Sequence, residues 1–407
     1  MNSFCRFITA AVFIGLAAIA CNPAQIDPSQ EERPAPDFPD KSNPNNIVTA
    51  LYINAPGVKE ISSKEEWTTG AEIYLMDDKG TRTNLGVTSI KRRGNSSFYF
   101  PKHSYNLKLE VKQAVLGMPA SKRWCLLAQW MDRTNLRNDV AFEVSRRFGM
   151  AWTPRGRFVK LYFNGDYRGL YYLVEKVKIA KNRINISDDG FIIDMDSNFD
   201  EAYKFRSEYF KMPVNIKEPD EDVITKEMFD NFKNYFNELE KRIYNKDASY
   251  TEMLDLDSFI KWALIQEVVG NAEYKHPKSV IMYKDVTGKL YSGPTWDHDW
   301  GTFVPNQKGF IIIWQHWYEA VSYDKTFYKR LKEIWQEVKP ELADIDAYIT
   351  ARAKVIRKAT ADDDKLWPIT QDENGDEHLS FDEAIERMKE SFNARVQALD
   401  DYIYNYY

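Results

Sequence analysis

The chain has 407 residues, and 43% of them are hydrophobic, so it can bury a substantial core. Its 55 basic and 61 acidic residues give a net charge of −6, which provides no overall positive field to recruit nucleic acid. The three cysteines, Cys5, Cys21 and Cys125, have spacings that suit neither a disulfide framework nor a thiolate metal site. The composition therefore indicates a globular protein without a nucleic-acid partner.

The first 21 residues are predicted to be a lipoprotein signal peptide. A single charge at Arg6 precedes an apolar run at 7–20, which is short for a membrane span but typical of a signal-peptide core. Small residues then lead into Cys21, a pattern that resembles the lipidation site of bacterial lipoproteins. A plain secretory leader with a coincidental cysteine is the alternative. The lipid-anchored interpretation predicts attachment to the bacterial cell envelope, facing the periplasm or the cell surface, with no other membrane segment.

Residues 22–46 are rich in Pro, Asn, Asp and Ser and almost free of aliphatic side chains. Such a segment cannot bury enough apolar surface to fold, so we expect a disordered tether. The folded domain is then predicted over 47–405. Residues up to about 180 have β-rich patterns and those from about 181 have mostly helical patterns, which indicates an α+β fold.

Strands dominate the first part of this predicted domain. Asn164-Gly165 between two alternating runs is the strongest hairpin signal. One helix, 134–149, has Thr134 as its candidate N-cap and Gly149 as its candidate C-cap. Cys125 lies in an apolar strand and is expected to be buried. The predicted strands are 47–53, 72–77, 89–91, 105–109, 158–163, 169–175, 190–196 and a short edge strand at 213–217.

Helices are predicted from residue 225 onward, and one hairpin interrupts them. Its first strand is 279–284, and a second short strand follows the turn at 285–288. Because a hairpin brings its ends together, Glu273 in the loop before it can converge with Asp297 and Asp299 in the loop after it. The predicted helices are 226–244, 254–270, 325–338, 340–360 and 381–404.

Four sequence blocks resemble, in their order along the chain, those of the spore coat protein H (CotH) kinase family, over roughly residues 45–340. The resemblance implies a two-lobed atypical protein-kinase-like fold, with a β-rich N-terminal lobe and a helix-rich C-terminal lobe. It also implies a phosphotransferase that uses ATP with Mg²⁺ or Mn²⁺. The blocks are Arg93-Gly94-Asn95-Ser96-Ser97, Asn271-Ala272-Glu273, Tyr283-Lys284-Asp285 and Trp296-Asp297-His298-Asp299-Trp300-Gly301.

The resemblance assigns Glu273 the position of the catalytic, base-like residue, where the family usually has an aspartate. It assigns Asp297 and Asp299 as ligands of the divalent ion, because phosphoryl transfer needs carboxylates that hold this ion and orient the acceptor hydroxyl. Turn formation is the alternative explanation for an Asp-rich loop. The lone His298 receives no role.

The kinase resemblance also suggests which residues would contact the nucleotide. The small-residue block that begins at Arg93 would lie over the phosphates, and Lys102 or Lys108 would reach them. Glu143 would pair with such a lysine, and Glu175 would lie beside the nucleotide where the chain crosses between lobes. The alternatives are solvent-facing lysines, pairing of Glu143 with neighbouring arginines, and Glu175 as a strand cap.

Two functions of different classes are consistent with these patterns. The first is an exported ATP-dependent kinase that phosphorylates a hydroxyl of an unidentified protein, or of a glycan. The second is a non-catalytic, pseudokinase-like binding lipoprotein that keeps the fold. A glycosidase with Glu273 and Asp297 as its carboxylate pair is chemically conceivable, but the order of the blocks fits it poorly.

The predicted anchor can be tested by replacing Cys21→Ala. This change removes the thiol that the signal would present for lipidation, so the variant is expected to lose its acyl chain and to leave the membrane fraction. Fatty-acid labelling and cell fractionation measure the two effects. If the Cys21→Ala protein were still acylated and bound to the membrane, Cys21 would not be the lipidation site.

Overall fold

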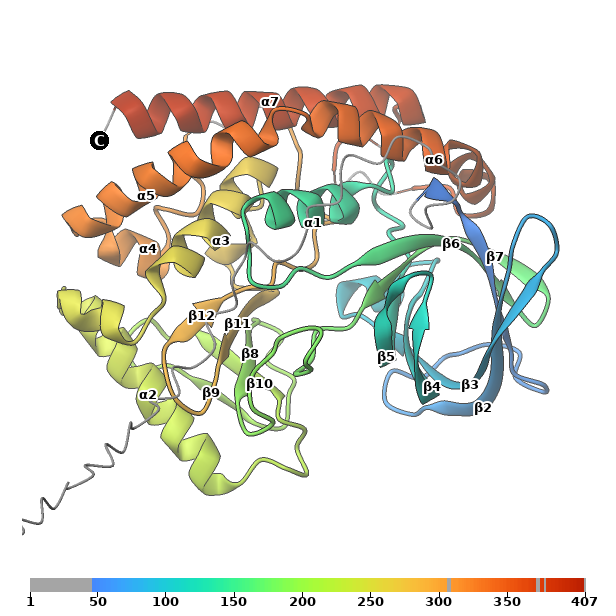
Figure 1. Cartoon of the computed structure of the whole chain (residues 1–407), viewed down its shortest axis with the longest axis horizontal. Helices are drawn as coiled ribbons and strands as arrows, with labels where there is room; N and C mark the ends of the chain where they lie inside the picture. Colours follow the sequence, from blue (N-terminus) through green and yellow to red (C-terminus); the bar gives the residue numbers. More distant parts are fainter. Residues whose placement is uncertain (1–45, 306–308, 371–373, 377, 406–407) are drawn as a thin grey trace, which may run out of the picture. The chain divides into compact units, whose positions relative to one another are not determined.

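The computed structural model describes residues 46–305, 309–370, 374–376 and 378–405. The predicted signal peptide, Cys21 and all but the last residue of the predicted tether lie outside the described residues. Every described residue belongs to one compact unit, Pro34–Tyr407. The unit contains both sheets and helices, which confirms the α+β class (Figure 1). The division into two lobes near residue 180 stays a prediction.

Seven strands close into a barrel in the first part of this unit (Figure 1). Their order is β1-β2-β3-β4-β5-β7-β6, and parallel pairing of β1 with β6 closes the ring, which leaves no free sheet edge. The sequence predicted most of these strands but not the closure. The strands are β1 (Thr49–Asn54), β2 (Thr68–Met76), β3 (Arg82–Arg93), β4 (Ser104–Val115), β5 (Met118–Leu127), β6 (Gly156–Phe163) and β7 (Asp166–Glu175).

The predicted hairpin at Asn164-Gly165 is confirmed as the connection between β6 and β7. Both residues have positive φ, 50° and 87°, as a two-residue hairpin turn of the right twist requires. The Asn164 side chain also accepts the backbone N–H of Ala55 at 2.7 Å, which ties the turn to the end of β1. Cys125 of β5 is buried, as expected.

A second sheet has the order β12-β11-β8-β10-β9, with antiparallel pairing throughout. The predicted hairpin is confirmed as β11 (Val280–Lys284) and β12 (Leu290–Ser292). The edge-strand prediction for 213–217 is wrong, because β10 (Pro213–Glu218) lies between β8 (Phe191–Met195) and β9 (Lys204–Arg206). Its residues are buried except Lys217, so tertiary pairing gives this short segment an interior position.

Seven α-helices are described, and several match their predicted bounds closely. Helix α3 begins after Asp255, whose side chain accepts the Ser258 N–H at 2.9 Å, and ends at Gly270 with a φ of 74°. The predicted N-cap Thr134 is wrong, because Leu136 occupies that position. The helices are α1 (Arg137–Arg147), α2 (Lys226–Tyr244), α3 (Leu256–Val269), α4 (His316–Val321), α5 (Lys325–Val338), α6 (Ile345–Leu366) and α7 (Phe381–Asn405).

Helices α1 and α6 pack against the outside of the barrel, and α1, α5 and α7 pack against α3 (Figure 1). Phe142 of α1 belongs to the same buried cluster as Cys125 and Val174, which point outward from β5 and β7. The barrel interior holds a separate cluster that includes Leu51, Trp124 and Leu173. Within the described ranges, each helix is too short or too polar to cross a membrane.

Lys102 joins the barrel to α6 and is not a member of a strand. Strand β4 begins only at Ser104, so Lys102 precedes the strand that carries Lys108. The Lys102 ammonium is fully buried, donates to the Leu170 carbonyl at 2.5 Å and forms an ion pair with Asp363 of α6 at 2.8 Å. Lys108, in contrast, is exposed on the outer face of β4.

Replacement of Lys102 tests this structural role. We expect Lys102→Met to lower the free energy of unfolding by about 3–5 kcal/mol, because the Asp363 carboxylate would stay buried without its cation. Lys112→Met, at an exposed position of β4, is the control and should change stability by less than about 0.5 kcal/mol. Denaturant midpoints measure both changes, and equal midpoints would contradict the assignment.

Candidate functional site

The β11–β12 hairpin brings the two ends of the candidate site together, as predicted. The Ser279 hydroxyl at the start of β11 donates to Asp297 Oδ2 at 3.3 Å. Both residues have positive φ, 54° and 65°, a region that side chains other than glycine rarely adopt. Such conformations cost about 1–3 kcal/mol each and persist where the surroundings hold them. The loop after β12 is therefore a constrained segment that presents an exposed Asp297.

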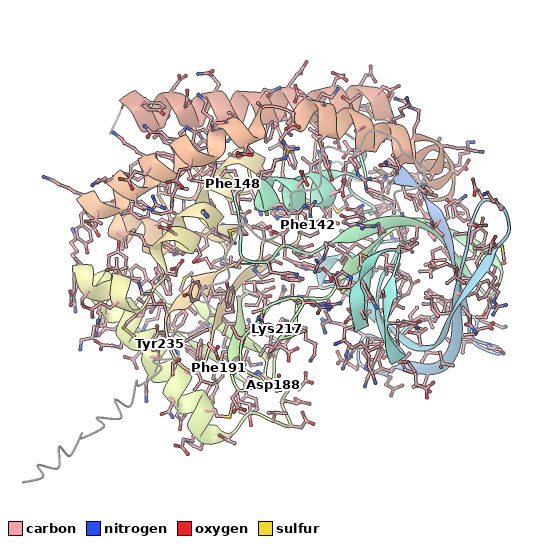
Figure 2. The ribbon with its side chains drawn as sticks, viewed as in Figure 1. Phe142, Phe148, Asp188, Phe191, Lys217 and Tyr235 are labelled. Atoms are coloured by element: carbon pink, nitrogen blue, oxygen red, sulfur yellow. The ribbon has the colours of Figure 1, made fainter. Side chains whose placement is uncertain are left out.

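Helix α1 holds this loop by its backbone. The Asn138 side chain accepts the His298 N–H at 2.9 Å, and Arg137 Nε donates to the Thr302 carbonyl at 3.0 Å. The buried His298 ring meets the edge of Phe142, labelled in Figure 2, with 6.2 Å between ring centroids. Burial lowers the pKa of His298 to about 3, so the imidazole is neutral. His298 therefore packs the loop onto α1 and carries no charge to the site.

Asn374, far along the chain, holds the other side of the loop. Its Nδ2 donates to the Asp299 carbonyl at 3.0 Å, and its Oδ1 accepts the Gly301 N–H at 2.8 Å. The sequence patterns did not identify Asn374, Arg137 or Asn138 as supports of this loop. No local signal could reveal this clamp, because its parts meet only in the tertiary structure.

Arg137 connects these supports to one another. Its guanidinium is 1% exposed and forms ion pairs of 2.8 Å with Asp132, which precedes α1, and with Asp376, which follows Asn374. Burial alone would lower the pKa of Arg137, but the two carboxylates outweigh it, and the pKa is raised. A permanent charge therefore ties α1, the acidic loop and the segment before α7 together.

Several carboxylates act on one another at this point. Burial and the negative charge of Asp297 raise the pKa of Glu273, in the 3-10 turn η5 (Glu273–Lys275), to about 8. Burial and Asp297 likewise raise the pKa of Asp299 to about 8. The structure thus brings together the three residues predicted to be catalytic or metal-binding, although their roles stay predictions.

Asp194 and Asp196 belong to the same group and were missed in the sequence. Asp194 lies on β8 beside β11, is buried, and its Oδ1 has no hydrogen-bond partner among the described residues. Burial raises its pKa to about 7, and the charges of Asp196 and Asp297 act in the same direction. The sequence signal that could have identified them is the pair of aspartates near the end of an apolar strand, Asp194-Met195-Asp196.

The donor chemistry of this group suits a hard divalent cation. Carboxylate oxygens are the side-chain ligands that Mg²⁺ and Mn²⁺ prefer. Across the described ranges, no three His, Cys, Asp or Glu side chains already surround one point as a complete metal centre would require. Mg²⁺ usually takes only one or two carboxylates and completes its shell with water and substrate phosphates. Asp297 and Asp299 therefore fit an ion that a phosphate ligand would complete.

The predicted nucleotide-contacting residues are placed very differently from one another. Arg93, at the end of β3, lies near the acidic loop, with its guanidinium carbon 5.5 Å from the centre of the Trp296 ring. Next to it, Gly94 has a φ of 105°, and a side chain there would collide with the Ser97 hydroxyl. The Lys102 ammonium is buried and paired with Asp363, so it is not available to this loop. Lys108 is exposed on β4 opposite Arg123 of β5, and its contact with the nucleotide stays a prediction.

The two predicted glutamates are engaged in other ion pairs. Glu143 contacts Arg146 at 3.0 Å and Arg147 at 2.9 Å on its own helix, so the alternative interpretation, pairing with neighbouring arginines, applies. Glu175, fully buried at the end of β7, accepts from Arg155 at 3.0 Å, and Arg183 approaches to 3.8 Å. These two carboxylates serve the internal structure.

The raised pKa of Glu273 predicts a distinct pH dependence of stability. Between pH 4.5, its ordinary pKa, and about pH 8, the folded state keeps a proton that the unfolded state has released, so stability falls as the pH rises. Glu273→Gln lacks this titration. In the presence of a chelator, we expect the difference in free energy of unfolding between Glu273→Gln and the wild type to shift by about 2–4 kcal/mol in favour of the variant as the pH rises from 5 to 8.5. Chemical denaturation across this range measures the gain, and parallel pH profiles would refute it.

Comparison with known proteins identifies the family. Residues 90–405, well over half of the chain, match the family described as CotH kinase protein. The match begins in β3 and runs through α7, so it extends further toward the C-terminus than the resemblance in sequence blocks suggested. No curated protein matches the chain. The chain belongs to the CotH kinase protein family.

Proposed function

We propose that this protein is a kinase that transfers the γ-phosphate of ATP to a hydroxyl of a protein or of a glycan. Its family membership supports the reaction class. The observation that carries the proposal is the convergence of Glu273, Asp297 and Asp299 at the two ends of the β11–β12 hairpin. Phosphoryl transfer requires such carboxylates, since catalysis there consists mainly of positioning and charge stabilisation.

Asp297 and Asp299 would hold the divalent ion, Mg²⁺ or Mn²⁺. Asp297 is exposed and hydrogen-bonded only to Ser279 among the described residues, so its carboxylate keeps free acceptor oxygens. When bound, the ion supplies positive charge that neutralises phosphate oxygens. The constrained loop backbone orients the two side chains before any ligand arrives, which is the preorganisation that such catalysis needs.

Glu273 would orient the acceptor hydroxyl and accept its proton. Its raised pKa arises from burial and from neighbouring negative charges, so compensation of Asp297 and Asp299 by a cation would move that pKa down again. Glu273 would then be ionised at neutral pH only in the loaded site. The Asn271 side chain fixes the turn, because its Oδ1 accepts the Glu273 N–H at 2.9 Å. This contact supports a defined position for a side chain one methylene longer than aspartate.

The proposed setting of the reaction is the cell envelope. The apolar N-terminal run that ends at Cys21 supports export and lipid anchoring. An exported kinase would meet its protein or glycan acceptor outside the cytoplasm. A binding lipoprotein without turnover is the competing function, and the presence or absence of transfer separates the two.

Incubation of the purified soluble domain with labelled ATP and Mg²⁺ or Mn²⁺ tests the proposal. We expect label on the protein itself or on an added envelope fraction. Asp297→Asn and Glu273→Gln should lower transfer at least about a hundredfold, because each removes a group positioned for the reaction. Glu273→Asp should retain transfer, since it keeps the carboxylate.

Asp188→Asn is the matched control for these variants. Asp188 is an exposed aspartate before β8 (Figure 2), and its replacement should leave transfer unchanged. Wild-type protein that transfers no label with either metal would favour the binding lipoprotein. Full transfer by Asp297→Asn would remove Asp297 from the site.

A further inference from the structure

Three basic side chains, Arg93, Arg123 and Lys176, gather where the barrel meets the acidic loop; we call them the cation cluster. Strands β5 and β7 pair with Trp124 opposite Glu175, so Arg123 and Lys176 are the next neighbours along the two strands. Their alternation places both on the outer face of the barrel, the face of Cys125 and not that of Trp124.

The cation cluster borders the acidic loop directly. Val177, which follows Lys176, and Trp296, which precedes Asp297, pack against the same small group of buried isoleucines. Arg93 stacks near the Trp296 ring, and its positive charge lowers both the pKa of Asp299 and that of Lys176. Arg93 therefore lies between the acidic residues and the other two cations.

The members of the cluster form no ion pair within the part of the chain that the structure describes. Among the described residues, no carboxylate oxygen lies within 4.0 Å of the Arg93, Arg123 or Lys176 side-chain nitrogens. Neighbouring cations behave differently, since Lys178 pairs with Glu218 at 3.2 Å and Arg155 with Glu175 at 3.0 Å. Among the described residues, the printed contact of the Arg123 guanidinium is aromatic: its carbon lies 5.5 Å from the centre of the Trp67 ring.

The surroundings of Lys176 disfavour its charged form. Burial lowers the pKa of Lys176 most, and Arg123 and Arg93 lower it further, while Cys125 and Glu218 act in the opposite direction without cancelling the shift. A half-buried ammonium beside two guanidinium groups costs stability unless an anion compensates it. Local arrangements that cost stability in this way are characteristic of functional sites.

We propose that Arg93, Arg123 and Lys176 bind the phosphate groups of the nucleotide. The inference rests on the proposed kinase function and deepens it, because it moves the phosphate-contacting lysine from Lys102 or Lys108 to Lys176. Guanidinium groups bind phosphate oxygens in a bidentate manner, and an ammonium adds a compact point charge. A polyphosphate would then lie between the cation cluster and a divalent ion held at Asp297. The cluster and the ion would each compensate part of its negative charge.

Calorimetric titration of the folded domain with tripolyphosphate, in chelator, tests the site without catalysis. We expect wild-type protein to bind, with an affinity that falls as salt rises. Lys176→Met should weaken binding at least tenfold, as should Arg123→Gln. Lys181→Met, an exposed lysine on the same segment, should bind like the wild type.

Thermal melting without ligand controls for folding. Because Lys176 has no carboxylate within ion-pair distance among the described residues, and its ammonium is partly desolvated, Lys176→Met should melt at or above the temperature of the wild type. Failure of the wild type to bind tripolyphosphate, or binding by Lys176→Met equal to that of the wild type, would overturn the inference.

The two proposals fail separately in these measurements. Tripolyphosphate binding that depends on Lys176, in a protein that never transfers label from ATP, would keep the phosphate site and remove the kinase. Transfer from ATP at the same rate in Lys176→Met and in wild type would keep the kinase and remove Lys176 from its phosphate site.

Discussion

The buried charge of Arg137 is the interaction on which the candidate site depends. Its guanidinium reaches Asp132 at the exit of the barrel, Asp376 before α7 and the carbonyl of Thr302 in the acidic loop. An arginine taken out of water in this way is stable only while all of its partners are present. Loss of one partner would leave a buried charge uncompensated, so these three parts of the chain are held as one structural unit around the loop that presents Asp297.

Two groups of like charges lie close to each other at that loop. In one group, burial and mutual repulsion raise the pKa values of Glu273, Asp299 and Asp194. The other group, the cation cluster, has no carboxylate within ion-pair distance among the described residues. Each group costs stability by itself, yet a phosphate ligand with a divalent ion would compensate both, because it carries both signs of charge. This complementarity links the proposed reaction to the inferred phosphate site.

The lysine assignments show where reasoning from sequence was insufficient. The kinase resemblance implies Lys102 or Lys108 as the phosphate-contacting lysine. Lys102 instead forms a buried pair with Asp363, a residue of α6 that is distant in sequence. Lys176 gave no sequence signal of its own, since its distinguishing property is the absence of a carboxylate partner. Whether a lysine is paired depends on which distant segments pack around it.

The sequence by itself determined the features that short-range physics controls. Asn164-Gly165 specified its hairpin through positive φ angles, Asp255 and Gly270 marked the ends of α3, and the β11–β12 hairpin predicted that Glu273 and Asp297 would meet. Only the tertiary structure decided the closure of the barrel by β1 and β6, the interior position of β10, and the clamp formed by Arg137 and Asn374. Turn and cap preferences act within a few residues, whereas strand order, desolvation and charge pairing arise from contacts between segments that are far apart in the chain.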